Sequence, residues 1–348
     1  DFKLVESLVD VLGFSRAVRA STLMDPQLAD LYASRHEFGG VYARVAASQR
    51  PVGAELATER TAGQHDIAVG TTSDRYPRRF DLPMNVVASE FMTGEGIADT
   101  TAGQLLHVVF AIPGERLSAA PAEAAGGLRY PLQFRLLVAD SAGRVVVQHD
   151  TLRVFAARQP VRHPDYLTGR IALPVPPGQY VYRLLVTTLD GGAGDLVTGE
   201  ARIDTLDPRR FAVSDVVVGR EGSGLVWHTA AGDTVRLNPL QRFPQGSGVN
   251  LYYEIYGLDR GASYHTVVRL EREGGRSFFS AIGRLFGGGR SPVLLEFDAP
   301  SEGPVTRVQR GIELRDVAKG SYRLVVTISN PATRTSVART ERFQVVDR

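Results

Sequence analysis

The histidines are the side chains best suited to metal binding or acid–base catalysis, and they are scattered along the chain. They are His36, His65, His107, His149, His163, His228 and His265. No pair of them has the HExxH spacing that sets two imidazoles and a catalytic glutamate on one helical face. The nearest approach to a cluster, His163-Pro-Asp165, is explained better by a turn. We therefore expect no metal site.

The serines and glycines form no recognisable nucleophile or phosphate-binding loop. Ser223 and Ser247 stand in EGSGL and QGSGV, which lack the GxSxG pattern of a nucleophile elbow and are typical of turns. The glycines of DGGAGD at 190–195 do not fit the dinucleotide fingerprint, and GGGR at 287–290 is not followed by Gly-Lys-Ser/Thr. We therefore expect no cofactor.

The chain contains no cysteine, which excludes disulfides, thiolate metal sites and a cysteine nucleophile. Spacing alone leaves carboxylate pairs for glycoside hydrolysis open, although no pair stands out in the sequence. These observations together favour a protein that is not an enzyme.

Three tyrosines in NLYYEIYGL offer a different chemistry, the stacking of a ligand on aromatic rings. In a strand, alternation places Tyr252 and Tyr256 on one face with Glu254 between them, and Tyr253 on the other. Tyr252 and Tyr256 could present a ligand face to a sugar. Packing against neighbouring strands is the reading that we favour. We expect the single tryptophan, Trp227, to fill the core of the C-terminal domain.

The segment RSFFSAIGRLFGGG is apolar where a connection between strands is normally polar. Its large apolar side chains fall at helical spacing on one stripe: Phe278, Phe279, Ile282, Leu285 and Phe286. Leaving each of them in water forfeits about 1.5–3 kcal/mol. They therefore require a cover, which could be the open end of a sandwich, a protein partner, or a membrane surface with the flanking arginines at the headgroups.

From Phe80 onward the apolar residues recur with period two, which is typical of β-strands with one solvent-facing side. The strands that we expect span 80–90, 104–111, 130–139, 144–155, 168–174, 179–189 and 196–205, and then 211–219, 234–237, 249–258, 263–273, 293–298, 305–315, 321–329 and 336–346. A turn over 140–143 joins two of them as a hairpin. This regular spacing predicts two tandem immunoglobulin-like sandwiches.

The two predicted sandwiches resemble each other near their ends. The first contains PPGQYVYRLLVTTLDG and the second VAKGSYRLVVTISNP. Gly178 and Tyr180 therefore correspond to Gly320 and Tyr322. We expect each tyrosine to form a tyrosine corner, in which the hydroxyl bonds back to the main chain.

The first 79 residues lack this pattern. Phe2, Val5 and Leu8 recur at helical spacing, and Asp25-Pro26 is a typical helix start. Residues 51–79 are polar and rich in Gly, Thr and Arg, which predicts an extended connection. These helices could pack on the rest of the chain or form an arm that contacts a neighbouring protein.

Composition limits the class of protein further. The 348 residues are too many for one ordinary domain, and the 40 basic and 38 acidic residues almost cancel, so no global field favours nucleic acid. No apolar run approaches the roughly 20 residues that span a bilayer. A cleaved signal peptide would account for a first residue that is Asp1 rather than methionine, and we expect an exported protein, with an ordered fragment as the alternative.

The C-terminal part carries a family resemblance. The stretches FAVSDVVVG, VNLYYEIYGL, HTVVRLERE, VLLEFDAP and GSYRLVVTISNPATRTSVARTERFQVV lie within residues 205–348. They resemble the C-terminal β-domain of bacterial GWxTD-domain proteins, although the GWxTD motif itself is absent. The resemblance implies β-sandwich modules and a location in the cell envelope, and it implies no catalytic residue.

We therefore expect a mainly β protein with a helical and extended N-terminal arm over 1–79, a sandwich over 80–206, and a second sandwich over 207–348 with the apolar insertion 276–290. The expected function is that of an exported, membrane-extrinsic structural subunit, periplasmic or in the cell envelope, that stabilises a larger complex. Its partners would be protein subunits, with contact at a membrane surface as a further option. A photosynthetic reaction-centre–antenna assembly, a secretion machine and an outer-membrane complex would all suit. A periplasmic carbohydrate- or peptide-binding module is the alternative.

Overall fold

The computed structural model describes residues 80, 82–94, 104–117, 119–121, 127–189, 191–222, 224–273, 293–314 and 317–347. These residues form a mainly β protein, as the period-two pattern predicted, and within them the one helical element is the short 3₁₀ turn η1 (Gly114–Arg116). The predicted N-terminal arm and the 276–290 segment lie outside the described residues.

Two sheets build the N-terminal half, residues 80–206. The larger sheet has the order β1 (Leu82–Pro83), β9 (Ala193–Ile203), β8 (Gly178–Thr188), β5 (Leu128–Asp140), β4 (Ala120–Pro121), with β6 (Val145–Ala157) paired to β5. The smaller sheet contains β2 (Val87–Thr93), β3 (Leu105–Pro113) and β7 (Tyr166–Pro174). Apart from the short parallel pairing of β1 with β9, neighbouring strands are antiparallel.

The core of this half lies between the two sheets. Alternate side chains of β5, such as Phe134 and Leu136, meet alternate side chains of β3, such as Phe110. The rings of Phe110 and Phe134 have their centroids 4.8 Å apart. Gly169 on β7 lies opposite Phe110, and a Cβ at this position would be only 2.4 Å from the ring, so the close packing requires glycine there.

The C-terminal half, residues 207–347, also has two main sheets. One has the order β10 (Ala212–Val213), β15 (Gly248–Tyr256), β11 (Val217–Arg220), with β18 (Val305–Glu313) paired to β15. The other has the order β14 (Arg242–Pro244), β20 (Thr335–Val346), β19 (Gly320–Asn330), β16 (Ser263–Arg272), β17 (Val293–Pro300). A separate hairpin pairs β12 (Leu225–His228) with β13 (Thr234–Leu237). A second core, which includes Tyr253, Val268 and Phe343, lies between the main sheets.

Both predicted tyrosine corners are present. The hydroxyl of Tyr180 donates to the carbonyl oxygen of Pro176 at 2.9 Å, and that of Tyr322 donates to the carbonyl oxygen of Ala318 at 2.6 Å. Each bond reaches back four residues and secures the entry to the strand that the tyrosine occupies. The correspondence between the two halves that the sequence predicted is therefore a structural one.

The predicted hairpin is also confirmed, whereas two predicted strands are each divided. The amide of Gly143 donates to the carbonyl of Asp140 at 2.8 Å, and Gly143 has a φ of 78°, which favours glycine. The strand predicted over 80–90 is split at Asn85, whose φ is 54°. The turn there moves the chain from the larger sheet, where β1 lies, to the smaller sheet, where β2 lies. The strand predicted over 211–219 is likewise divided into β10 and β11.

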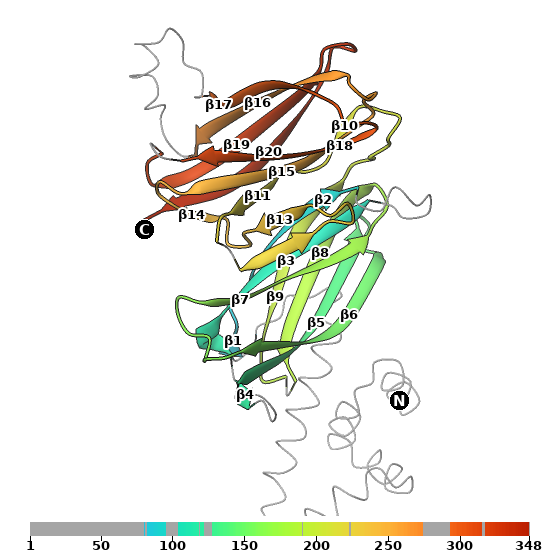
Figure 1. Cartoon of the computed structure of the whole chain (residues 1–348). Coiled ribbons are helices and arrows are strands. Elements are labelled where there is room, and N and C mark those ends of the chain that lie inside the picture. The colour runs from blue at the N-terminus through green and yellow to red at the C-terminus, as the bar shows by residue number, and fades with distance from the viewer. Residues whose placement is uncertain are drawn as a thin grey trace, which may run out of the picture.

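The two halves meet end to end, with the β12–β13 hairpin lying against β2 and β3 (Figure 1). A third hydrophobic cluster occupies this junction and draws residues from both halves: Phe91, Val109, Val217, Trp227, Val235, Leu237 and Tyr252. The prediction that Trp227 fills the core of the C-terminal half was therefore wrong. Its place in the hairpin turns it toward the other half.

Candidate functional site

Aromatic packing closes the junction around Trp227. The indole ring lies 5.6 Å from the ring of Phe91 and 5.5 Å from the ring of Tyr252, which it meets edge-on. Phe91 comes from the N-terminal half and Tyr252 from the C-terminal half. Because all three rings are almost fully buried, separating the halves would expose a large apolar area to water.

His107 lies in the same junction and is fully buried. Its ring stacks on Phe91 with centroids 4.5 Å apart. Nδ1 lies 2.7 Å from an amino group of Arg170, and Nε2 lies 2.8 Å from the hydroxyl of Thr93. Because arginine can only donate, Nδ1 accepts, and Nε2 carries the proton and donates to Thr93. Burial, and then the charge of Arg170, hold the pKa of His107 well below its usual range, so the imidazole is a neutral structural group.

A buried carboxylate joins the halves beside this cluster. Glu254 on β15 accepts hydrogen bonds from the hydroxyls of Tyr252 and Tyr256 and, at 2.9 Å, from the amide of Gly94 at the end of β2. Tyr252 and Tyr256 are each only 1% exposed. They therefore present no ligand face at the surface. The alternative prediction, that Tyr252 and Tyr256 form a ligand site, was wrong. Alternation did place both on one face, but that face is covered by the other half.

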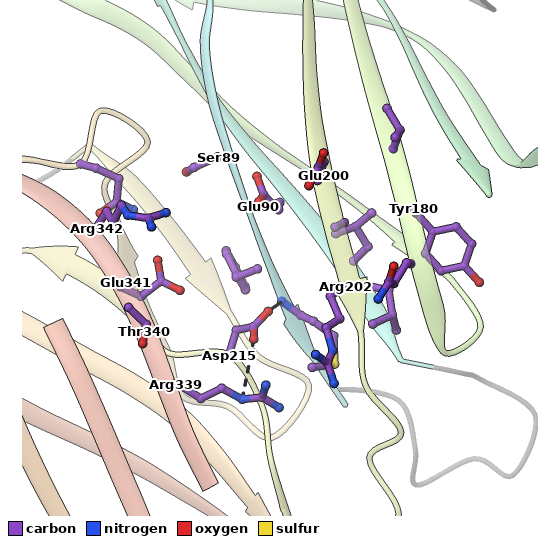
Figure 2. A pocket seen from close by; sticks show the side chains of 18 of the residues that line it. Ser89, Glu90, Tyr180, Glu200, Arg202, Asp215, Arg339, Thr340, Glu341 and Arg342 are labelled. Carbon is purple, nitrogen blue, oxygen red and sulfur yellow. Dashed lines mark hydrogen bonds and ion pairs between the residues drawn. The ribbon is translucent and has the colours of Figure 1, made fainter. Parts of the chain in front are cut away.

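A cleft of about 830 Å³ opens at the edge of the junction. Strands β2, β8 and β9 supply one wall, and β20 and the segment before β11 supply the other (Figure 2). Its charged lining includes Glu90, Glu200, Arg202, Asp215, Arg339 and Glu341. This cleft is the candidate functional site, because ionisable side chains from both halves meet there.

Arg339 on β20 holds one side of the cleft in place. Its guanidinium contacts Asp204 at 2.7 Å and Asp215 at 3.9 Å, and donates to the carbonyl oxygens of Val213 and Ser214. Asp215 in turn accepts the amide of Met92 on β2 at 2.8 Å. Burial raises the pKa of Asp215, and the charge of Arg339 opposes the rise.

Glu90 and Glu341 project from opposite walls (Figure 2). Glu90 accepts the hydroxyl of Tyr182 at 2.8 Å, and burial raises its pKa. Glu341 accepts no hydrogen bond from any described residue. Burial, and then repulsion from Asp215 and Glu90, raise the pKa of Glu341 well above its usual range.

The sequence analysis did not find these carboxylates. Glu90, Asp215 and Glu341 are separated by more than a hundred residues, so no spacing links them. A weaker signal was available in the strand alternation. Glu341 shares its parity with the buried Phe343, and Glu90 shares its parity with the buried Met92, so both are acidic residues at inward-facing positions.

The histidines that the structure describes form no metal-binding group. Among the described residues, no group of three or more histidine, aspartate or glutamate side chains could hold a metal ion. His163 lies in a turn in which the amide of Asp165 donates to the carbonyl of Arg162, as expected.

The carboxylates that line the cleft can accept hydrogen bonds and neutralise positive charge, and this is the chemistry that the cleft offers.

The remaining predicted contact residues, Phe2, Val5, Leu8, Phe278, Phe279, Ile282, Leu285 and Phe286, lie outside the described residues. Their role stays a prediction.

No protein-family model matches the chain, and no curated protein matches it. Among solved structures, the soluble domain of PmoD from Methylocystis sp. ATCC 49242 (Rockwell) is similar to 38% of this chain and to 89% of its own length, at 12% identity and a TM-score of 0.22. A TM-score this low carries no argument about function. In the part of the chain that the structure describes, no helix is long and apolar enough to cross a membrane.

Proposed function

We propose that this protein is a non-catalytic structural subunit, exported and membrane-extrinsic, that stabilises a larger protein complex of the cell envelope. In this proposal residues 80–206 and 207–348 are two immunoglobulin-like sandwiches that act as one rigid spacer. The paired sheets around a core in each half and the two tyrosine corners support the sandwich assignment.

The junction supports the rigid spacer. A flexible pair of domains would meet through a small polar interface, whereas these halves share an apolar cluster and the buried carboxylate Glu254. Two polar contacts therefore add to the apolar cluster. They are the hydrogen bond from the amide of Gly94 to Glu254 and the ion pair of Arg339 with Asp204. A spacer with this junction keeps its two ends at a fixed distance and orientation.

The observation that carries the proposal is the exposed edge of the larger N-terminal sheet. Strand β6 pairs with β5 along 13 residues, and no other described strand pairs with its outer edge. Its exposed large apolar side chains are Val145 (45%), Val146 (41%), Leu152 (56%) and Val154 (56%). Large apolar side chains on a free sheet edge favour aggregation, and no described strand covers these four, so they favour a protein partner that does.

A pull-down from native membranes in mild detergent tests the proposal. The intact chain is expected to retain a defined set of protein subunits. The variant Leu152→Ser/Val154→Ser is expected to lose most of them, because serine removes the apolar contact while keeping the strand. The variant Phe278→Ser/Phe279→Ser/Phe286→Ser tests the apolar 276–290 segment in the same way.

The matched control is Val226→Ser, which changes an exposed valine on β12 and should leave the retained subunits unchanged. Far-ultraviolet circular dichroism and thermal unfolding establish that each variant is folded. If the intact chain runs alone as a monomer, the structural proposal fails. Activity against ester, peptide or glycoside substrates would also contradict it.

A further inference from the structure

We infer that the cleft between the two halves binds a guanidinium group, presented by an arginine side chain of a partner polypeptide. This inference rests on the proposed function in one respect, namely that the partner is a protein. The site itself follows from the charges and unpaired acceptors in the cleft.

The first argument is the imbalance of charge. The three arginines of the cleft are already paired: Arg202 and Arg339 both contact Asp204, at 2.9 and 2.7 Å, and Arg342 contacts Glu273 at 2.9 Å. Neither Asp204 nor Glu273 belongs to the lining of the cleft. Of the lining carboxylates, Asp215 has only the 3.9 Å contact with Arg339, and three form no ion pair with a described residue: Glu90, Glu200 and Glu341.

The second argument is the presence of acceptors that lack donors. Glu341 is half-buried, points into the cleft and accepts no hydrogen bond from a described residue (Figure 2). The side-chain oxygen of Gln241, which also lines the cleft, is buried and has no hydrogen-bond partner. Buried acceptors are normally satisfied, so the orphaned oxygen of Gln241, beside the unpaired carboxylate of Glu341, indicates that a donor-rich group belongs there.

The third argument is the placement of the acceptors on both walls. Glu90 stands on β2 in the N-terminal half, while Glu341 and Gln241 belong to the C-terminal half. A guanidinium carries five N–H donors in one plane and sheds its hydration more readily than an ammonium group. It can therefore bond to both walls at once. The volume of about 830 Å³ admits an arginine side chain from outside.

The experiment measures binding of acetyl-Gly-Arg-Gly-amide to the full chain by isothermal titration calorimetry at low salt. The matched probe is the same peptide with citrulline in place of arginine, because citrulline keeps the shape and loses the charge. Free L-arginine amide distinguishes a small-molecule source of the guanidinium from a polypeptide source. The arginine peptide is expected to bind at least tenfold more tightly than either of the other two.

Glu341→Gln is expected to weaken the arginine peptide at least tenfold, because it removes the unpaired carboxylate and keeps the side-chain shape. Glu90→Gln is the second variant and should also weaken binding. Glu302→Gln, at an exposed acidic residue remote from the cleft, is the control and should change nothing. Unfolding curves of all three variants report whether the fold is kept.

Equal binding of the arginine and citrulline peptides, or binding that Glu341→Gln and Glu90→Gln leave unchanged, would overturn the site. Binding of free L-arginine amide as tight as that of the peptide would overturn the polypeptide source. Absence of arginine binding together with a retained complex in the pull-down would refute this inference alone and leave the proposed function in place.

Discussion

The guanidinium of Arg339 on β20 lies 2.7 Å from the carboxylate of Asp204, in the segment that leaves β9. The contact joins the last strand of the C-terminal half to the connection between the halves. Both side chains are mostly shielded from water, at 17% and 26% exposed. Arg339 also donates hydrogen bonds to the carbonyl oxygens of Val213 and Ser214. It therefore holds in place the segment that positions Asp215 in the cleft.

Arg339→Ala should therefore reduce the free energy of unfolding by about 3 kcal/mol, since it removes the shielded ion pair with Asp204 and leaves the two carbonyls without their side-chain donor. Urea unfolding followed by circular dichroism measures the change. The control is Arg144→Ala, whose arginine is largely exposed and pairs with Asp140. It should lose less than about 1 kcal/mol. Equal losses in the two variants would show that the contacts of Arg339 contribute no more to stability than an exposed ion pair does.

The pH dependence of stability should report on Glu341. Its pKa is raised in the folded protein, so the folded state binds the proton more tightly than the unfolded state. Stability therefore falls as pH rises from the usual carboxyl range through the raised pKa. The groups that face Glu341 are Asp215, Glu90, Arg339 and Arg342.

Glu341→Gln replaces the titratable carboxyl group with an amide that stays neutral at every pH. The variant is expected to gain stability relative to the natural protein at pH 7–8 and to match it near pH 4. Unfolding free energies of both proteins across that range test the expectation. A stability difference that does not vary with pH would contradict the raised pKa.

The two tyrosine corners should contribute similar amounts to stability. Tyr180→Phe and Tyr322→Phe each remove one hydroxyl and leave one carbonyl unpaired, so each should cost about 1–2 kcal/mol. Tyr166→Phe is the control, because the hydroxyl of Tyr166 forms no hydrogen bond with a described residue. Its loss should be within about 0.5 kcal/mol. Chemical unfolding of the three variants under one set of conditions makes the comparison.

The fluorescence of the single tryptophan should report on the junction. Phe91→Ala removes a ring that packs on Trp227 and should lower the free energy of unfolding by about 3–5 kcal/mol. It should also shift the emission of Trp227 to longer wavelength, because water gains access. Val226→Ala, on the exposed side of the same hairpin, should leave the emission in place. An unshifted spectrum in Phe91→Ala would mean that the junction closes over the gap.

Local pattern predicted the features that depend on neighbours along the chain. Alternation of apolar residues located most strands, because each strand must bury one face whatever sheet it joins. The turn ending at Gly143 and the tyrosine corners of Tyr180 and Tyr322 were also predicted, since each bond spans only three or four residues. Where a strand changes sheets, as at Asn85, periodicity continued through the break and could not reveal it.

The sequence by itself determined a mainly β chain, its repeated ends and the absence of cysteine chemistry. Only the tertiary structure decided that Trp227 and Tyr252 lie between the halves, and that Glu90, Asp215 and Glu341 share one cleft. These residues are far apart in the chain, and strand pattern does not encode how two folded halves dock. Burial and repulsion act on the three carboxylates only after docking, and they then raise the pKa of each.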